Sequence, residues 1–138
     1  IRDRNAIAYA KKIISQAIAL RDQNSGNKNR SILKTAVDFI DSHYMEEDMS
    51  LNKAANAANV SANHFSALFS QNMGQTFIEY LTNLRMNKAK EYLRCTSMRS
   101  SEIAGEIGYK DAHYFSYLFK KTQGMTPSDY RKAREDKA

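Results

Sequence analysis

Two stretches of the sequence combine an apolar stripe with small polar side chains that could bind a partner. In the first stretch, Phe65, Leu68 and Phe69 have the i, i+3, i+4 spacing that is typical of a buried helix face. The opposite face carries Ala62, Asn63, Ser66 and Ala67. Asparagine can pair bidentately with adenine, serine can bond to several bases, and an alanine methyl can contact a thymine methyl. These types indicate readout of A·T-rich base edges, with a solvated surface amide as the alternative for Asn63.

The second stretch repeats the apolar stripe and adds positive charge. Phe115, Leu118 and Phe119 take the buried positions, and the outward residues are Ala112, His113, Ser116 and Tyr117. His113 could contact a base edge or a phosphate, or it could be half-buried at the start of its helix. The residues predicted to contact DNA phosphate are Ser61, Arg85, Lys120, Lys121 and Arg131. The basic residues among them have an alternative as surface ion pairs, and Arg85 could instead bind acidic groups across the two halves of the protein.

Both stretches belong to an internal repeat. The segment FSALFSQNMGQTFIEY from Phe65 matches FSYLFKKTQGMTPSDY from Phe115 at an offset of fifty residues. The identical pairs are Phe65/Phe115, Ser66/Ser116, Leu68/Leu118, Phe69/Phe119, Gly74/Gly124, Thr76/Thr126 and Tyr80/Tyr130. Because one supersecondary unit is used twice, its function has to explain the repetition.

Each copy is predicted to form two helices joined by a turn. In the first copy, Ser50 caps a helix over residues 51–58, residues 59–61 form the turn, and a second helix over 62–73 ends at Gly74. In the second copy, a helix over 102–107 precedes the turn 108–110, and Asp111 caps a helix over 112–123 that ends at Gly124. These lengths are typical of helix-turn-helix units, whose second helix enters the major groove of DNA.

The segment between the copies is predicted to be one long amphipathic helix. Thr76 and Glu79 form a capping box at its start, and Thr126, Pro127 and Asp129 mark the start of a further helix after the second copy. A helix of about 18 residues over 76–94 would span roughly 27 Å. Together with the flanking turns, such a helix could hold the two second helices at a separation comparable with one turn of duplex DNA, about 34 Å. The spacing therefore suits two recognition helices in successive major grooves.

Composition favours an all-α protein. The chain has 138 residues with 42% hydrophobic content, and its five glycines and single proline leave little room for hairpins. No apolar run is long enough to span a membrane, and the one cysteine, Cys95, cannot form an internal disulfide, so we expect a reducing cytoplasm. The net charge of +6 is compatible with nucleic-acid binding. No lysine or arginine lies between Lys53 and Arg85, however, which predicts weak phosphate attraction by the first copy.

The first thirty residues form a separate feature. Residues 1–24 have apolar side chains at three- and four-residue steps, and residues 24–30 are polar. We expect a connector helix followed by a linker, and the helix could dimerise through residues 5–21, lead from a sensor or receiver domain, or fold back on the rest. The chain begins without methionine, so we expect it to be part of a longer polypeptide. The predicted domains are residues 1–30, a first lobe at 31–75, a linker helix at 76–94 and a second lobe at 95–138.

Several strings resemble the tandem helix-turn-helix domain of AraC/XylS transcription regulators. They are VSANHFSALFSQNMG, the R-x-x-x-A-x-x-x-L pattern of Arg85, Ala89 and Leu93, and EIAGEIGYKDAHYFSYLFKKTQGMTPSDYR. The resemblance covers about residues 31–135. It implies a seven-helix, two-lobed domain that inserts both second helices into major grooves on one face of DNA and recruits RNA polymerase as an activator. From the N-terminal helix we also expect an upstream sensor or receiver domain in the same polypeptide.

Enzymatic chemistry has no support in the sequence. His43, His64, His113 and Cys95 lack metal-ligand spacing, and neither a phosphate-binding glycine loop nor a nucleophile motif is present. We therefore expect no catalytic site, metal or cofactor. The remaining alternative is a helical protein-interaction module that docks on a sensor domain or RNA polymerase. Tandem repetition at a fixed spacing favours DNA, because its grooves repeat.

Overall fold

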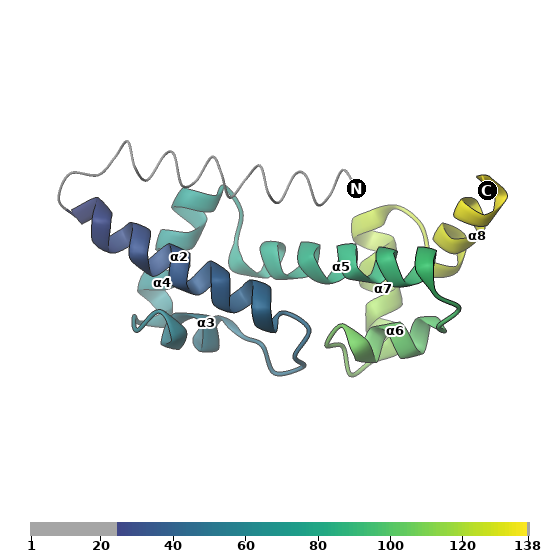
Figure 1. Ribbon diagram of the computed structural model, residues 1–138, viewed down its shortest axis with the longest axis horizontal. Coiled ribbons are helices and arrows are strands. Elements are labelled where there is room, and N and C mark those ends of the chain that lie inside the picture. Colours follow the sequence, from purple (N-terminus) through teal and green to yellow (C-terminus); the bar gives the residue numbers. More distant parts are fainter. Residues whose placement is uncertain (1–24, 138) are drawn as a thin grey trace. The chain divides into compact units, whose positions relative to one another are not determined.

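The computed structural model describes residues 25–137, which contain helices and no strand (Figure 1). Residues 25–137 form seven helices, α2 (Ser25–His43), α3 (Leu51–Ala57), α4 (Ala62–Met73), α5 (Phe77–Cys95), α6 (Ser100–Glu106), α7 (Ala112–Gln123) and α8 (Pro127–Lys137). The prediction of an all-α fold with two helix-turn-helix units and a long helix between them is confirmed. Within the described range the chain forms two compact units. Unit 1 contains residues 25–43 and 49–82, and unit 2 contains residues 44–48 and 83–137.

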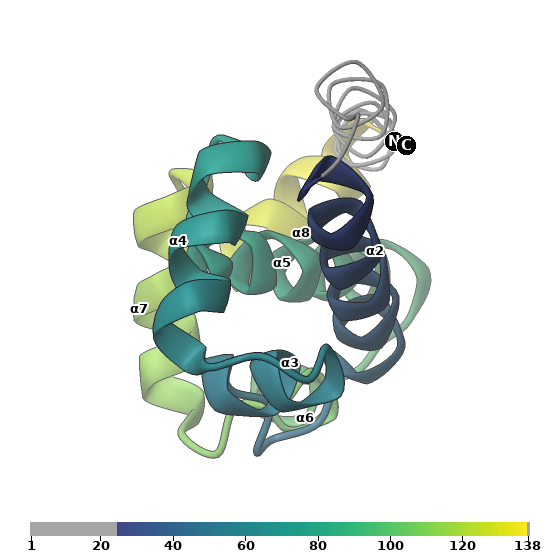
Figure 2. The same ribbon diagram turned by 90° about the vertical axis from the view of Figure 1, so that its left-hand side faces the viewer.

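Unit 1 is built from α2, α3, α4 and the first turns of α5. Helix α3 lies across the ends of α2 and α4 (Figure 2). The centre of this unit is aromatic, because Phe69 packs against Phe65 and Tyr80 with ring centroids 5.5 Å apart in each pair. The hydroxyl of buried Tyr80 donates to Asp41 Oδ1 at 2.8 Å. Burial and the nearby Asp38 raise the pKa of Tyr80, so its hydroxyl remains a donor.

Unit 2 is built from the remainder of α5 with α6, α7 and α8. Its buried hydrophobic core consists of Met86, Ala89, Leu93, Ile103, Ala104, Ile107, Phe115 and Phe119. Phe115 and Phe119 are ring neighbours at 5.9 Å, and Tyr130 of α8 meets Phe119 edge-on at 5.8 Å. The predicted apolar stripe of the second copy is therefore the side of α7 that faces this core.

The helix ends follow the predicted chemistry. The Ser50 and Ser61 hydroxyls accept from the amides of Lys53 and His64 at the starts of α3 and α4. Asp111 accepts from two amides of α7. The Thr76 and Glu79 pair forms both bonds of a capping box. Left-handed glycines, Gly74 and Gly124, end α4 and α7.

Two element boundaries differ from the sequence expectation. Helix α6 spans Ser100–Glu106, not residues 102–107, because the Glu102 side chain accepts from the Arg99 amide and caps the helix earlier. Residues 25–30 form the first turns of α2, so the linker predicted there is wrong. The apolar face that begins at Ile32 stabilises the helix by packing. Extending an existing helix by further polar residues at its N-terminus then costs little free energy. The connector helix expected over residues 1–24, with its dimerisation segment 5–21, lies outside the described residues.

Candidate nucleic-acid interface

Helix α4 presents a small, uncharged face to solvent. Asn63 and Ala67 are exposed, and Ala62 and Ser66 are half-buried at its edges. Ser61 is exposed at the N-cap, where its hydroxyl accepts from the His64 amide at 3.2 Å. A hydroxyl that accepts one bond can still donate its own proton to a phosphate. The four predicted readout positions thus lie together on the side of α4 that does not pack into unit 1.

Helix α7 presents the corresponding face with larger and more basic side chains. His113, Tyr117, Lys120 and Lys121 are exposed. Ser116 is half-buried, and Ala112 packs partly against the core of unit 2. The two lysines lie in the last turn, where they also suit the negative end of the helix dipole. Because His113 is exposed, the alternative of a half-buried histidine at the start of this helix is wrong.

Tyr114 is a surface residue that the sequence reasoning missed. In the structure, 51% of its surface is exposed. Its ring meets Tyr109 at 6.0 Å and Tyr117 at 6.5 Å. The signal in the sequence was the i, i+3 spacing of Tyr114 and Tyr117, which puts both rings on one flank of α7.

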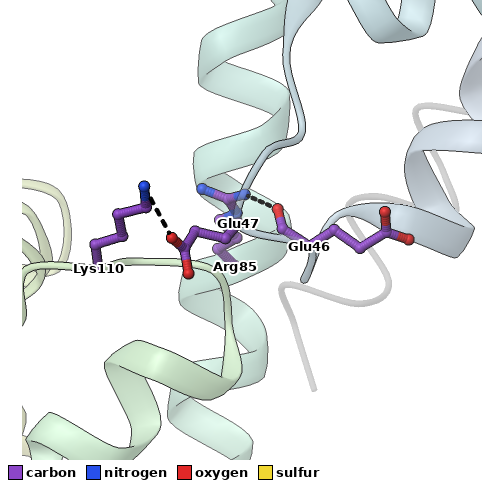
Figure 3. A network of polar contacts seen from close by, with 4 residues as sticks. All are labelled: Glu46, Glu47, Arg85 and Lys110. Carbon is purple, nitrogen blue, oxygen red and sulfur yellow. Dashed lines mark hydrogen bonds and ion pairs between the residues drawn. The ribbon is translucent and has the colours of Figure 1, made fainter.

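Arg85 does not lie at the candidate interface. Only 6% of it is exposed, its Nε donates to the Tyr44 carbonyl at 2.7 Å, and its Nη2 donates to the Glu46 carbonyl at 2.8 Å. Its guanidinium carbon also lies 4.9 Å from the centroid of the Tyr109 ring. Figure 3 shows the bond to Glu46, together with the ion pair between Lys110 and Glu47. This geometry does not support the expected phosphate contact, because Nε and Nη2 of Arg85 already donate to carbonyls inside unit 2.

Arg131 is also engaged within unit 2. Its Nε donates to the Leu93 carbonyl and its Nη2 to the Thr96 carbonyl, both at 3.1 Å. These carbonyls lie at the end of α5, where a helix leaves acceptors without partners in its own backbone. Arg131 therefore caps α5, and its predicted phosphate contact is not supported by this geometry.

The positive charge at the candidate interface is concentrated on α7. Helix α4 contains no lysine or arginine, whereas α7 ends with Lys120 and Lys121. Lys110, in the turn before α7, is highly exposed and pairs with Glu47 at 3.2 Å. Pairs of this exposure contribute little to stability, so Lys110 can exchange its partner easily.

The described residues contain neither a metal-binding cluster nor a membrane-spanning helix. No group of three or more His, Cys, Asp or Glu side chains among them could hold a metal ion. None of the helices from α2 to α8 is both long and apolar enough to cross a membrane.

Comparison with known proteins identifies the family. A model described as a helix-turn-helix domain matches residues 54–133. The lactose operon transcription activator of Staphylococcus xylosus is 36% identical over 99 residues, which are 72% of this chain and 35% of that protein. The C-terminal domain of AraT, a response regulator from Geobacillus stearothermophilus, is 40% identical with a TM-score of 0.73, covering 75% of this chain and 85% of that one.

The DNA-binding domain of AdpA, solved in complex with a target DNA, shares the fold with a TM-score of 0.71 at 21% identity, over 78% of this chain and 95% of that one. The chain belongs to the AraC-type helix-turn-helix family of DNA-binding domains found in bacterial transcription regulators. It spans only 12% to 38% of the length of the first curated relatives that it matches.

Proposed function

We propose that this domain binds double-stranded DNA sequence-specifically, with α4 and α7 in successive major grooves, and that it activates transcription. The observation that carries the proposal is the repeated helix-turn-helix unit whose second helix keeps one face on its core and one face in solvent. DNA repeats its major groove once per turn, so a repeated reader matches a repeated target.

The proposed readout residues are those on the two outward faces. On α4 they are Ala62, Asn63, Ser66 and Ala67, and on α7 they are Ala112, His113, Ser116 and Tyr117. Phosphate contacts are assigned to Ser61, Lys120 and Lys121, which are exposed at helix ends. The larger charge on α7 supports a stronger backbone contribution from unit 2 than from unit 1.

The proposal for the whole polypeptide extends to its partners and location. AraT is a response regulator, which supports an upstream receiver or sensor domain in this protein as well. The lactose operon transcription activator of Staphylococcus xylosus supports activation by this protein as well. We propose RNA polymerase as its protein partner. Dimerisation through residues 5–21 and a cytoplasmic location complete the proposal.

Selection of bound duplexes from a random library, followed by titration of the best duplex over a range of salt, tests the function. We expect a bipartite motif with half-sites one helical turn apart and an affinity that falls as salt rises. A motif confined to one half would contradict reading by both units. Failure to recover any motif, with binding lost at moderate salt, would instead favour the protein-interaction module.

A further inference from the structure

A column of aromatic rings and cations runs from the interior of unit 2 to the exposed face of α7. Buried Arg85 lies against Tyr109, and Tyr109 meets Tyr114 edge-on at 6.0 Å. Tyr114 and Tyr117 follow at 6.5 Å, and Lys121 Nζ lies 5.9 Å from the Tyr117 ring centroid. These separations are within the range where rings attract one another and attract cations. The two exposed rings are therefore linked to a buried anchor.

The column holds a large apolar surface in water. Tyr114 is 51% exposed and Tyr117 is 59% exposed. Each ring has neighbours that restrict its rotamers, so it loses little conformational entropy when a partner covers it. A rigid, exposed ring pair is suited to a specific apolar contact.

The ring pair distinguishes α7 from α4. At the offset of fifty residues, Tyr114, Tyr117 and Lys121 correspond to His64, Ala67 and Gln71. The pair of exposed tyrosine rings is therefore present on α7 and absent from α4. Lys120 and Lys121 provide positive charge on the same exposed helix, which is complementary to the phosphates that border a major groove.

We propose that Tyr114 and Tyr117 recognise thymine methyl groups in the half-site bound by α7. This inference rests on the DNA binding proposed above. Thymine is the only standard base that presents a methyl group in the major groove, and apolar side chains recognise it by contact. The ring faces supply that contact, so recognition does not depend on the tyrosine hydroxyls.

Replacement of single thymines by deoxyuridine tests the inference, because it removes the methyl group and keeps the O4 acceptor. The probe is the best duplex from the random library. We expect the unmodified domain to lose about fourfold in affinity at one or two thymines of one half-site, the value of one buried methyl. Tyr114→Ala or Tyr117→Ala should bind the thymine duplex more weakly and no longer distinguish deoxyuridine at its own position.

Conservative and distant variants provide the controls. Tyr114→Phe and Tyr117→Phe keep the ring and should keep the methyl discrimination. Ile78→Ala removes a side chain that is 62% exposed on α5 and should change neither affinity nor discrimination. Urea unfolding of each variant verifies that the fold is intact.

Two results would overturn the inference while leaving the proposed function in place. One is a salt-dependent, sequence-specific affinity that does not change when any thymine becomes deoxyuridine. The other is an equal loss for thymine and deoxyuridine duplexes in the alanine variants, which would mean that the rings contact the sugar-phosphate backbone. Absence of specific duplex binding by the unmodified domain would refute both proposals.

Discussion

At the scale of single residues, Arg85 and Gly108 define one close contact inside unit 2. A Cβ atom at Gly108 would lie 2.7 Å from Arg85 Nη2 and 3.0 Å from the Met45 carbonyl oxygen. The guanidinium cannot move aside freely, because it also donates to the carbonyls of Tyr44 and Glu46. The glycine and the arginine therefore depend on each other.

Replacement of Arg85 should affect stability and leave the electrostatics of DNA binding unchanged. Arg85→Met keeps an apolar stem but leaves two carbonyls without their donor, so we expect a loss of about 1 to 3 kcal/mol in the free energy of unfolding. Urea titration measures this loss. The slope of log DNA affinity against log salt concentration should not change. A slope reduced by about one, with normal stability, would show instead that Arg85 contacts a phosphate.

Two glycines of unit 2 should respond in opposite directions to alanine. Gly108 has a φ of +103°, which an L-residue rarely adopts, and its added methyl would collide with Arg85. Gly108→Ala should therefore cost at least about 2 kcal/mol. Gly105 lies exposed in α6 with nothing within 4 Å of its Cβ position, and Gly105→Ala should stabilise by about 0.5 to 1 kcal/mol. Thermal unfolding of both variants is the measurement, and equal effects would refute the assigned packing.

His113 and Lys120 should affect DNA binding in different ways. His113→Ala should cost about 1 to 3 kcal/mol and relax preference at particular base pairs. Lys120→Ala should weaken all duplexes alike and lower the salt slope by about one. Binding of a panel of single-base variants of the selected duplex separates the two effects. Uniform losses for both variants would contradict the readout role of His113.

At the scale of elements, the Thr76 and Glu79 capping box couples the start of α5 to pH. The amide and hydroxyl of Thr76 bond to the Glu79 carboxylate and hold its pKa below the ordinary value of 4.5. Because the folded state favours the ionised form, the stabilisation is complete above pH 4.5 and disappears as the pH falls through the lowered pKa.

Thermal unfolding of Glu79 variants at several pH values checks this coupling. Glu79→Ala should lower the melting temperature at pH 7, and the difference from the unmodified domain should vanish in acid. Glu79→Gln is the matched control, since its amide oxygen can still accept from Thr76 but does not titrate. A constant Glu79→Ala difference across the whole pH range would contradict the assigned cause.

Local chemistry explains why most element boundaries could be predicted. Caps at Ser50, Ser61 and Asp111 and stops at Gly74 and Gly124 depend on residues next to the boundary, so the sequence displays them directly. Arg85 was predicted to contact phosphate, and its actual hydrogen-bond partners could not be predicted because they lie about forty residues earlier in the chain. Its four-residue steps to buried Ala89 and Leu93 were the available signal, since they put Arg85 on the inward face of α5.

At the scale of the whole molecule, the division into units does not follow chain order. Residues 44–48 connect α2 to α3 of unit 1, yet they pack in unit 2, where Tyr44 and Glu46 accept from Arg85. Hydrophobic periodicity cannot reveal this arrangement, because the contacts are made by backbone carbonyls, which every residue carries. The two helix-turn-helix copies could be predicted from their repeat. That residues 44–48 belong to unit 2 could be seen only in the structure.

The paired core phenylalanines allow each unit to be destabilised separately. Phe65 and Phe115 occupy the same repeat position, and neither has exposed surface. Phe65→Ala and Phe115→Ala should each cost about 3 to 5 kcal/mol through cavity formation. In the bipartite duplex, Phe65→Ala should reduce sequence preference in the half bound by α4, and Phe115→Ala in the half bound by α7.

Amide hydrogen exchange of each variant identifies which helices lose protection. DNA footprinting of the same variants shows which half-site is still contacted. Loss of both half-sites in both variants would mean that the units fold and read DNA as one cooperative body, whereas near-neutral stability would contradict the packing of the repeated stripe.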